Sequence, residues 1–171
     1  EELWQSNHLP ELPYISEEDI ALSLVRYQRW EHSTDGESPA VIRDEMQKIM
    51  QEDFGVFRTG DIMASGLKRL HALRERLNHA RLADKSKVFN TDRISALELD
   101  NLMATAYATA VSAITRTESR GAHSREDYPE RDDTNWIKHT LYFEAGDAID
   151  YRPVNTSPKH IEAFQPKERV Y

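Results

Sequence analysis

The segment from residue 116 to residue 141 concentrates side chains that could do chemistry. Six acidic residues are interspersed with four arginines there: Glu118, Glu126, Asp127, Glu130, Asp132 and Asp133 with Arg116, Arg120, Arg125 and Arg131. The charges do not recur at helical spacing, and Gly121 and Pro129 interrupt them. A guanidinium is a planar fork of donors that can bind both oxygens of a carboxylate. The segment is therefore predicted to be irregular backbone held by specific arginine–carboxylate bonds.

The same carboxylates also invite a catalytic interpretation. Glu126–Asp127 and Asp132–Asp133 are adjacent pairs, and paired carboxylates can act as general acid and base when their pKa values differ. The nearby arginines favour the ionised form of all four, so none is predicted to hold a proton near neutral pH. The residues around His123 also lack the nucleophile-elbow pattern of a serine hydrolase. Ion-pair scaffolding is favoured over catalysis.

Metal and nucleotide sites are not predicted. The chain has seven histidines and no cysteine, and neither His71 with His79 nor His123 with His139 has the spacing of a known ligand set. No two of the six glycines form a G-x-G pattern, so the usual phosphate cradle of a flavin or NAD site is missing. We expect no catalytic, cofactor-binding or metal-binding residue in this chain, which on its own should not be an enzyme.

Four helices are predicted to position the charged segment, and the first of them begins at residue 16. Ser16 can cap it, with Asp19 as the capping-box partner, and the helix is expected to stop near residues 34–36. Apolar residues recur along it at helical spacing: Ile20, Leu24 and Tyr27.

The next three helices are expected to form the body of the fold. One begins at Ser38–Pro39 and ends at a Gly55 cap, and another begins near Thr59. Their apolar residues recur at helical spacing: Ile42, Met46, Ile49, Met50, Phe54, Met63, Leu67, Leu70 and Leu77. After a loop over 84–90, the longest helix runs from residue 91 or 92 to about residue 116. It carries alanines on several faces, so it should be central.

The last part of the chain is predicted to form a hairpin and a tail. Residues 136–143 and 149–154 have strand composition around a turn at 144–147, and residues 155–171 should be extended. The predicted fold is mainly α: a spectrin-repeat-like up-down bundle of three to four helices with a small C-terminal β-hairpin and an extended tail. We expect a junction arm over 1–15, the bundle over 16–120, and the charged segment, hairpin and tail packed on it over 121–171.

Composition excludes several classes of partner. The formal net charge of −8 argues against nucleic acid, whose phosphates need clustered Lys and Arg. The mean hydropathy is −0.73, and no apolar run approaches the roughly 20 residues that a membrane-spanning helix needs. Direct membrane insertion is therefore not expected.

Several motifs together resemble one protein family. The charged segment reads RTESRGAHSREDYPERDD, and it is accompanied by DFGVFR at 53–58, FNTD at 89–92, LELDNLMATAY at 97–107 and a terminal KERVY. Over residues 16–171 the chain resembles the C-terminal helical domain of the flavoprotein subunit of succinate dehydrogenase and its fumarate reductase relatives.

The resemblance implies a larger parent protein. Such a parent oxidises succinate to fumarate with a covalently attached FAD and passes electrons to an iron–sulfur subunit and then to quinone in a membrane anchor. It would lie on the cytoplasmic face of a bacterial inner membrane, or on the matrix face in a mitochondrion. The family's catalytic motifs lie in the upstream flavin domain, and none of them occurs in this chain. The chain would contribute packing against that domain.

Six residues of the charged segment are our candidates for the contact with an upstream FAD-binding domain: Arg120, His123, Arg125, Asp127, Arg131 and Asp132. Densely paired charges on irregular backbone gain most when a neighbour excludes water from them. Alternatives are a stand-alone helical interaction module, and the same domain from a fumarate reductase or an L-aspartate oxidase.

Overall fold

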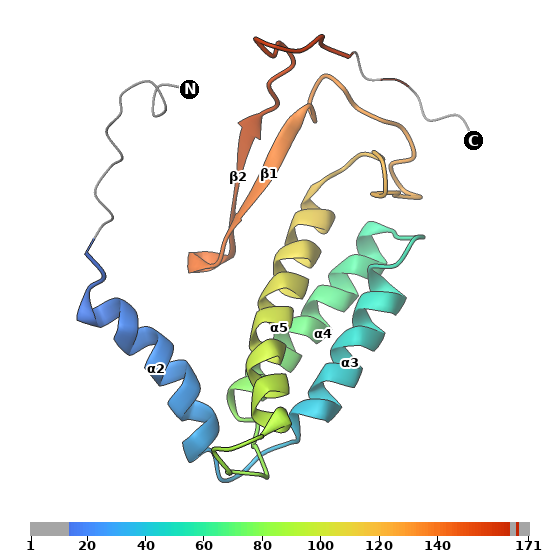
Figure 1. Ribbon diagram of the computed structural model, residues 1–171. Helices are drawn as coiled ribbons and strands as arrows, with labels where there is room; N and C mark the ends of the chain where they lie inside the picture. Colours follow the sequence, from blue (N-terminus) through green and yellow to red (C-terminus); the bar gives the residue numbers. More distant parts are fainter. Residues whose placement is uncertain (1–13, 165–166, 168–171) are drawn as a thin grey trace.

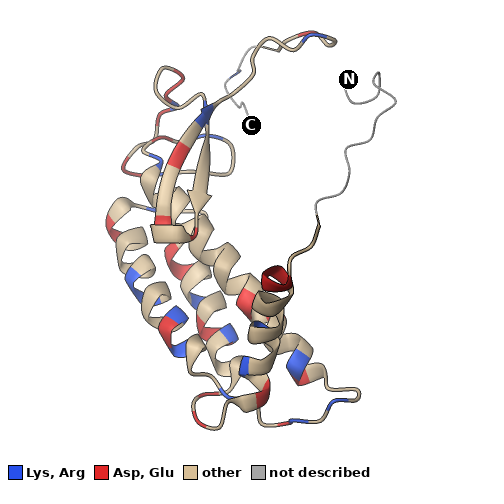
Figure 2. Ribbon diagram, turned by 90° about the vertical axis from the view of Figure 1, so that its left-hand side faces the viewer, with Lys and Arg blue, Asp and Glu red and all other residues tan. Residues whose placement is uncertain are grey.

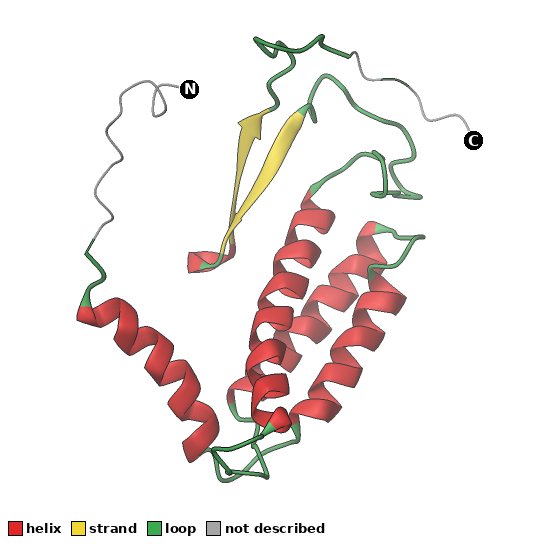
Figure 3. Ribbon diagram, viewed as in Figure 1, coloured by secondary structure: helices red, strands yellow, loops and turns green. Residues whose placement is uncertain are grey.

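The computed structural model describes residues 14–164 and 167, and within them the chain forms four helices and one small sheet (Figures 1 and 3). The elements are α2 (Glu17–His32), α3 (Pro39–Asp53), α4 (Gly60–Asn78), α5 (Thr91–Thr115), β1 (Lys138–Phe143), η1 (Ala145–Asp147) and β2 (Ala148–Pro153). The mainly helical prediction is confirmed. No helix in this described part is long and apolar enough to cross a membrane. The predicted arm over 1–15 lies almost wholly outside the described residues.

Local capping explains where each helix begins. Ser16 and Asp19 form the predicted capping box, and Ser38 accepts a hydrogen bond from Ala40 N ahead of Pro39. Thr59 caps α4 through Ile62 N. Such caps satisfy backbone N–H groups that have no partner within the first turn.

The predicted cap at Gly55 is wrong. α3 ends at Asp53 and Phe54 is its C-cap, with Phe54 N bonded to Met50 O. Gly55 is absent from the glycines with positive φ, so it does not take the left-handed backbone of a glycine cap. The aromatic ring of Phe54 is buried in the core, which anchors the chain at this point.

The core lies between α3, α4 and α5. α5 is central as predicted, because its buried residues include Ala106, Ala110 and Ala113 and it contacts α3, α4, α2 and β1. The predicted stripe of α2 is not buried: Ile20 and Leu24 are exposed, and the one buried side chain of this helix is Trp30. α2 diverges from the other helices in Figure 1 and is bonded to α5 through its C-terminal half, from Arg26 to Trp30.

The hairpin packs on α5 above the bundle. β1 and β2 are antiparallel with Lys138 opposite Pro153 and Phe143 opposite Ala148. The strand begins at Lys138, two residues later than predicted. Asp147 in the turn accepts hydrogen bonds from Tyr142 (2.6 Å), Arg74 (3.3 Å) and Tyr107 (3.4 Å), which fasten the turn to α4 and α5. Burial and the hydrogen bond to Asp147 together raise the pKa of Tyr142 to about 12.

Candidate functional site

Glu118 is the centre of the charged segment. Its side chain is fully buried, and its carboxylate accepts hydrogen bonds from Arg116, from Arg120 Nε (2.9 Å) and Nη2 (3.1 Å), and from Asp132 N (2.9 Å). Burial alone would raise the pKa of Glu118, but the bonds from Arg120, Asp132 N and Arg116 outweigh it and lower the pKa. Glu118 is therefore an ionised structural anchor.

Arg125 joins the ends of two helices. It is 3% exposed and forms a two-pronged ion pair with Asp127, with Nε–Oδ1 and Nη2–Oδ2 distances of 2.8 and 2.6 Å. Its Nη1 donates to the carbonyls of Ile114 (3.1 Å) and Arg116 (3.2 Å) at the C-terminal end of α5. Asp127 accepts from Gly60 N (2.8 Å) at the start of α4. The bonds from Arg125 and Gly60 N hold the pKa of Asp127 far below its ordinary value.

His123 is held as a neutral imidazole. Its Nε2 lies 3.0 Å from the carbonyl oxygen of Arg116, and its Nδ1 lies 3.4 Å from Arg58 Nη1. A carbonyl only accepts and a guanidinium only donates, so Nε2 carries the proton and Nδ1 accepts. Burial lowers the pKa of His123, and the neighbouring charges of Arg58, Arg125 and Arg116 add to that effect.

The outer rim of the segment is partly exposed. The carboxylate of Asp133 forms ion pairs with Arg120 (N–O distance 2.6 Å) and Arg131 (3.0 Å), and both arginine side chains are 30% exposed. Asp132 accepts from Thr134 N (3.0 Å) and Asn135 N (2.9 Å), so it closes a turn. The rim therefore presents two ion-paired arginines that are still partly accessible to solvent.

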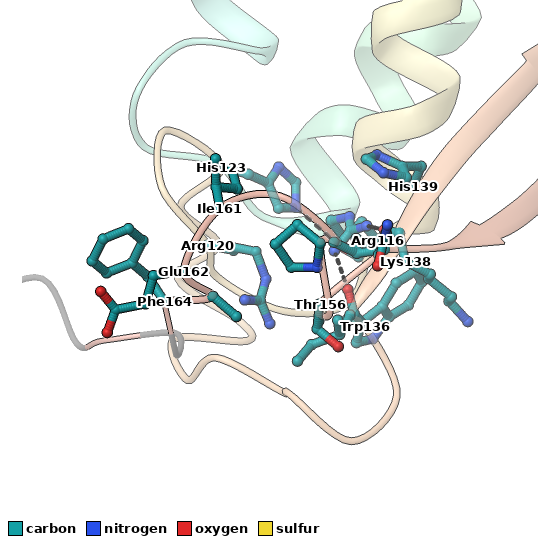
Figure 4. Close-up of a pocket in the computed structure, with 15 residues that line it drawn as sticks. Arg116, Arg120, His123, Trp136, Lys138, His139, Thr156, Ile161, Glu162 and Phe164 are labelled. Atoms are coloured by element: carbon teal, nitrogen blue, oxygen red, sulfur yellow. Dashed lines mark hydrogen bonds between the residues drawn. The ribbon is translucent and has the colours of Figure 1, made fainter. Parts of the chain in front are cut away.

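A pocket of about 600 Å³ adjoins this rim (Figure 4). Basic side chains from the charged segment and from β1 line it: Arg116, Arg120, His123, Lys138 and His139. Ile161 and Phe164 of the tail also line it, and both are largely exposed. The arrangement could hold an acidic group flanked by apolar side chains.

An exposed apolar loop lies beside the charged segment. Val56 and Phe57, between α3 and α4, are 69% and 75% exposed. The next residue, Arg58, forms a β-bridge with Arg125, and its carbonyl accepts from Glu126 N (3.0 Å). Large exposed apolar side chains next to arginines are typical of protein contact surfaces.

The sequence predicted part of this site. The six candidates Arg120, His123, Arg125, Asp127, Arg131 and Asp132 lie in or beside one bonded network. Lys138 and the tail residues were missed, and His139 was considered only as a metal ligand, because only the hairpin register and the path of the tail bring them to the pocket. Phe57 was noticed as part of a motif, but no local signal indicated that it is exposed. Among the described residues no group of three His, Cys, Asp or Glu could hold a metal ion.

Comparisons with known proteins converge on one family. A family model described as fumarate reductase flavoprotein C-term matches residues 43–171. The succinate dehydrogenase flavoprotein subunit of Coxiella burnetii is 58% identical over 161 residues, which cover 93% of this chain and 27% of that protein. The fumarate reductase flavoprotein subunit of Escherichia coli is 42% identical over 141 residues, which cover 80% of this chain and 23% of that protein.

A solved structure agrees with these sequence matches. E. coli quinol fumarate reductase superimposes with a TM-score of 0.76 at 35% identity, covering 90% of this chain and 27% of that chain. The chain thus spans about a quarter of the length of the proteins that it matches.

Proposed function

This chain belongs to the family of fumarate reductase flavoprotein C-terminal regions, and from that premise we propose that it is the C-terminal structural domain of a succinate dehydrogenase flavoprotein subunit. The observation that carries the proposal is the closed arginine–carboxylate network around Glu118 and Arg125. Its acids are engaged by donors that keep them ionised, so they support a rigid scaffold rather than proton transfer. The chain itself supplies no catalytic group in this proposal.

The activity is proposed for the longer protein. That longer protein would oxidise succinate to fumarate with a covalently bound FAD held by an upstream domain. It would pass the electrons to an iron–sulfur subunit and a membrane anchor. The complex would be peripheral, on the cytoplasmic face of a bacterial inner membrane or the matrix face of a mitochondrion. The oxidative direction is supported by one relative, the succinate dehydrogenase subunit of Coxiella burnetii, at 58% identity. Other succinate dehydrogenase subunits, at 40–42%, are no more similar to this chain than the fumarate reductase subunits, at 42–43%.

We further propose that the charged segment contacts the upstream FAD-binding domain. Arg120, His123, Arg131 and Asp132 would face that domain, because they lie on the partly exposed rim or at the pocket. Arg125 and Asp127 would act indirectly, because they fix the backbone between the end of α5 and the start of α4. The exposed side chain of Phe57 would add apolar contact area at the same end of the bundle.

The first experiment is the intact mass and visible spectrum of the native protein that carries this sequence. A polypeptide about three and a half times as long as 171 residues, with flavin that stays attached after denaturation, is expected. A colourless protein of 171 residues would contradict the proposal and favour a stand-alone interaction module.

The second experiment tests the contact with the variant Arg120→Ala in the full-length subunit. Loss of the bonds to Glu118 and Asp133 should loosen the rim, lower flavin retention and increase proteolytic release of the C-terminal region. Arg76→Ala is a matched control, since Arg76 is also an ion-paired, partly exposed arginine, bound to Glu37 and Glu45 on another part of the bundle. Equal flavin retention in the two variants would rule out the contact at Arg120.

A further inference from the structure

Helix α2 carries more apolar surface than the bundle covers. Residues 20–25 are uncharged and lie between an acidic first turn and Arg26. Figure 2 shows the acidic first turn in red. Four large side chains there are half exposed or more: Ile20 (52%), Leu22 (69%), Leu24 (50%) and Val25 (63%). A helix that is apolar on most of its faces is normally buried.

Only the C-terminal half of α2 is fixed to the bundle. Trp30 is fully buried, and its Nε1 donates to Asp100 Oδ2 at 3.0 Å. Lys85 Nζ donates to the carbonyls of Trp30 (2.8 Å) and Ser33 (2.7 Å), which lie at the end of the helix. These bonds set the direction of α2, so its N-terminal half projects away from α5 in a defined position (Figure 1).

A groove of about 490 Å³ separates α2 from α4 and α5. Leu77, Met103 and Ala104 contribute its apolar side, and Val25 and Arg26 line it from α2. Arg26 donates to the neutral Asn101 (2.8 Å), and no carboxylate within residues 14–164 forms an ion pair with it. The groove also has charged lining: Arg29 pairs with Asp100 and Arg74 pairs with Glu144. Arg26 is thus the lining cation that forms no ion pair within the described part of the chain, beside the apolar side chains of Val25, Leu77 and Met103.

We propose that this α2 groove holds a segment of the upstream part of the longer protein, with an apolar side chain against Val25 and Met103 and a carboxylate at Arg26. The inference rests on the proposed function. The matched relatives are about three and a half times as long as this chain. The matching family model describes a C-terminal region, so most of each relative precedes the matched part. α2 is the first described helix and thus the element nearest in sequence to that upstream part.

Hydrogen exchange in the full-length flavoprotein tests the proposal. The amides of residues 20–25 already donate hydrogen bonds within α2, so the occupant is read as a difference between variants. Val25→Asp should speed their exchange at least about tenfold relative to wild type, because it places a charge in an apolar contact. Leu24→Asp is the matched control: Leu24 is also exposed, but it lies about 100° round the helix and does not line the groove. Its effect should be clearly smaller.

The other outcomes are distinguishable. Unprotected amides in a flavin-containing full-length protein, or equal effects of the two variants, would overturn the groove proposal and leave the proposed function intact. Protection that disappears on dilution would identify a second copy as the occupant and also overturn it. If the full-length protein holds no flavin, the proposed function itself fails.

Discussion

At the scale of single residues, Glu118 shows how a carboxylate without solvent contact stays ionised. Removing an ion from water costs several kcal/mol, and each hydrogen bond to a charged group returns about 1.5–3 kcal/mol. Glu118 receives bonds from two arginines and one backbone N–H, which together are of the size needed to offset that cost. Loss of the carboxylate would leave Arg116 and Arg120 without their shared counter-ion.

Glu118→Gln is therefore expected to destabilise the chain by about 3 kcal/mol at pH 7, the cost of breaking a buried charge pair. The measurement is urea unfolding of the chain. Glu130→Gln is the control, since that side chain is exposed and forms no ion pair with another described residue. It should change the free energy of unfolding by less than about 0.5 kcal/mol.

The effect of Glu118→Gln should also depend on pH in one direction. The folded pKa of Glu118 is lowered, so its contribution is present above the unfolded value of about 4.3 and is lost as pH falls through the folded pKa. The difference in free energy of unfolding between the wild type and the variant should therefore shrink below about pH 4. If Glu118→Gln lowers the free energy of unfolding equally at pH 7 and pH 3, the charge of Glu118 is not the cause of the destabilisation.

At the scale of elements, Gly66 marks the crossing of α3 and α4. A Cβ at this position would lie 2.4 Å from Asp53 Cβ and 2.7 Å from Phe54 Cε2. Alanine normally stabilises a helix by about 1 kcal/mol over glycine, but overpacking costs about 1–3 kcal/mol. Gly66→Ala should thus lower the melting temperature, whereas Ser65→Ala on the exposed face should leave it unchanged or raise it slightly. An increase for Gly66→Ala would show that the two helices separate easily.

The sequence predicted what is decided locally and missed what is decided by packing. Ser16 and Ser38 mark helix starts because a cap needs only its own first turn. Ile20 and Leu24 have helical spacing, but whether a stripe meets the core depends on where the whole helix lies. The pairing of Arg125 with Asp127 and with the end of α5 also could not be chosen from the sequence, which offers six acids to four arginines.

At the scale of the whole molecule, the loop 54–59 and the charged segment lie at one end of the bundle, and the loop before α5 lies at the other (Figure 1). Both ends expose a phenylalanine: Phe57 is 75% exposed and Phe89 is 99% exposed. Only Phe57 adjoins the arginine–carboxylate network, through Arg58 and its bridge to Arg125. The two residues therefore offer a matched test of which end meets the flavin domain.

In the full-length protein, Phe57→Ser should weaken docking of the C-terminal region by about 2 kcal/mol, in the range for loss of a large apolar contact at an interface. Flavin retention and resistance to limited proteolysis between the two domains should both fall. Phe89→Ser should leave both unchanged, because its end of the bundle lies about 37 Å away along α5, a helix of 25 residues. If Phe89→Ser has the larger effect, the flavin domain meets the opposite end of the bundle, and the charged segment serves only to close the helices upon one another.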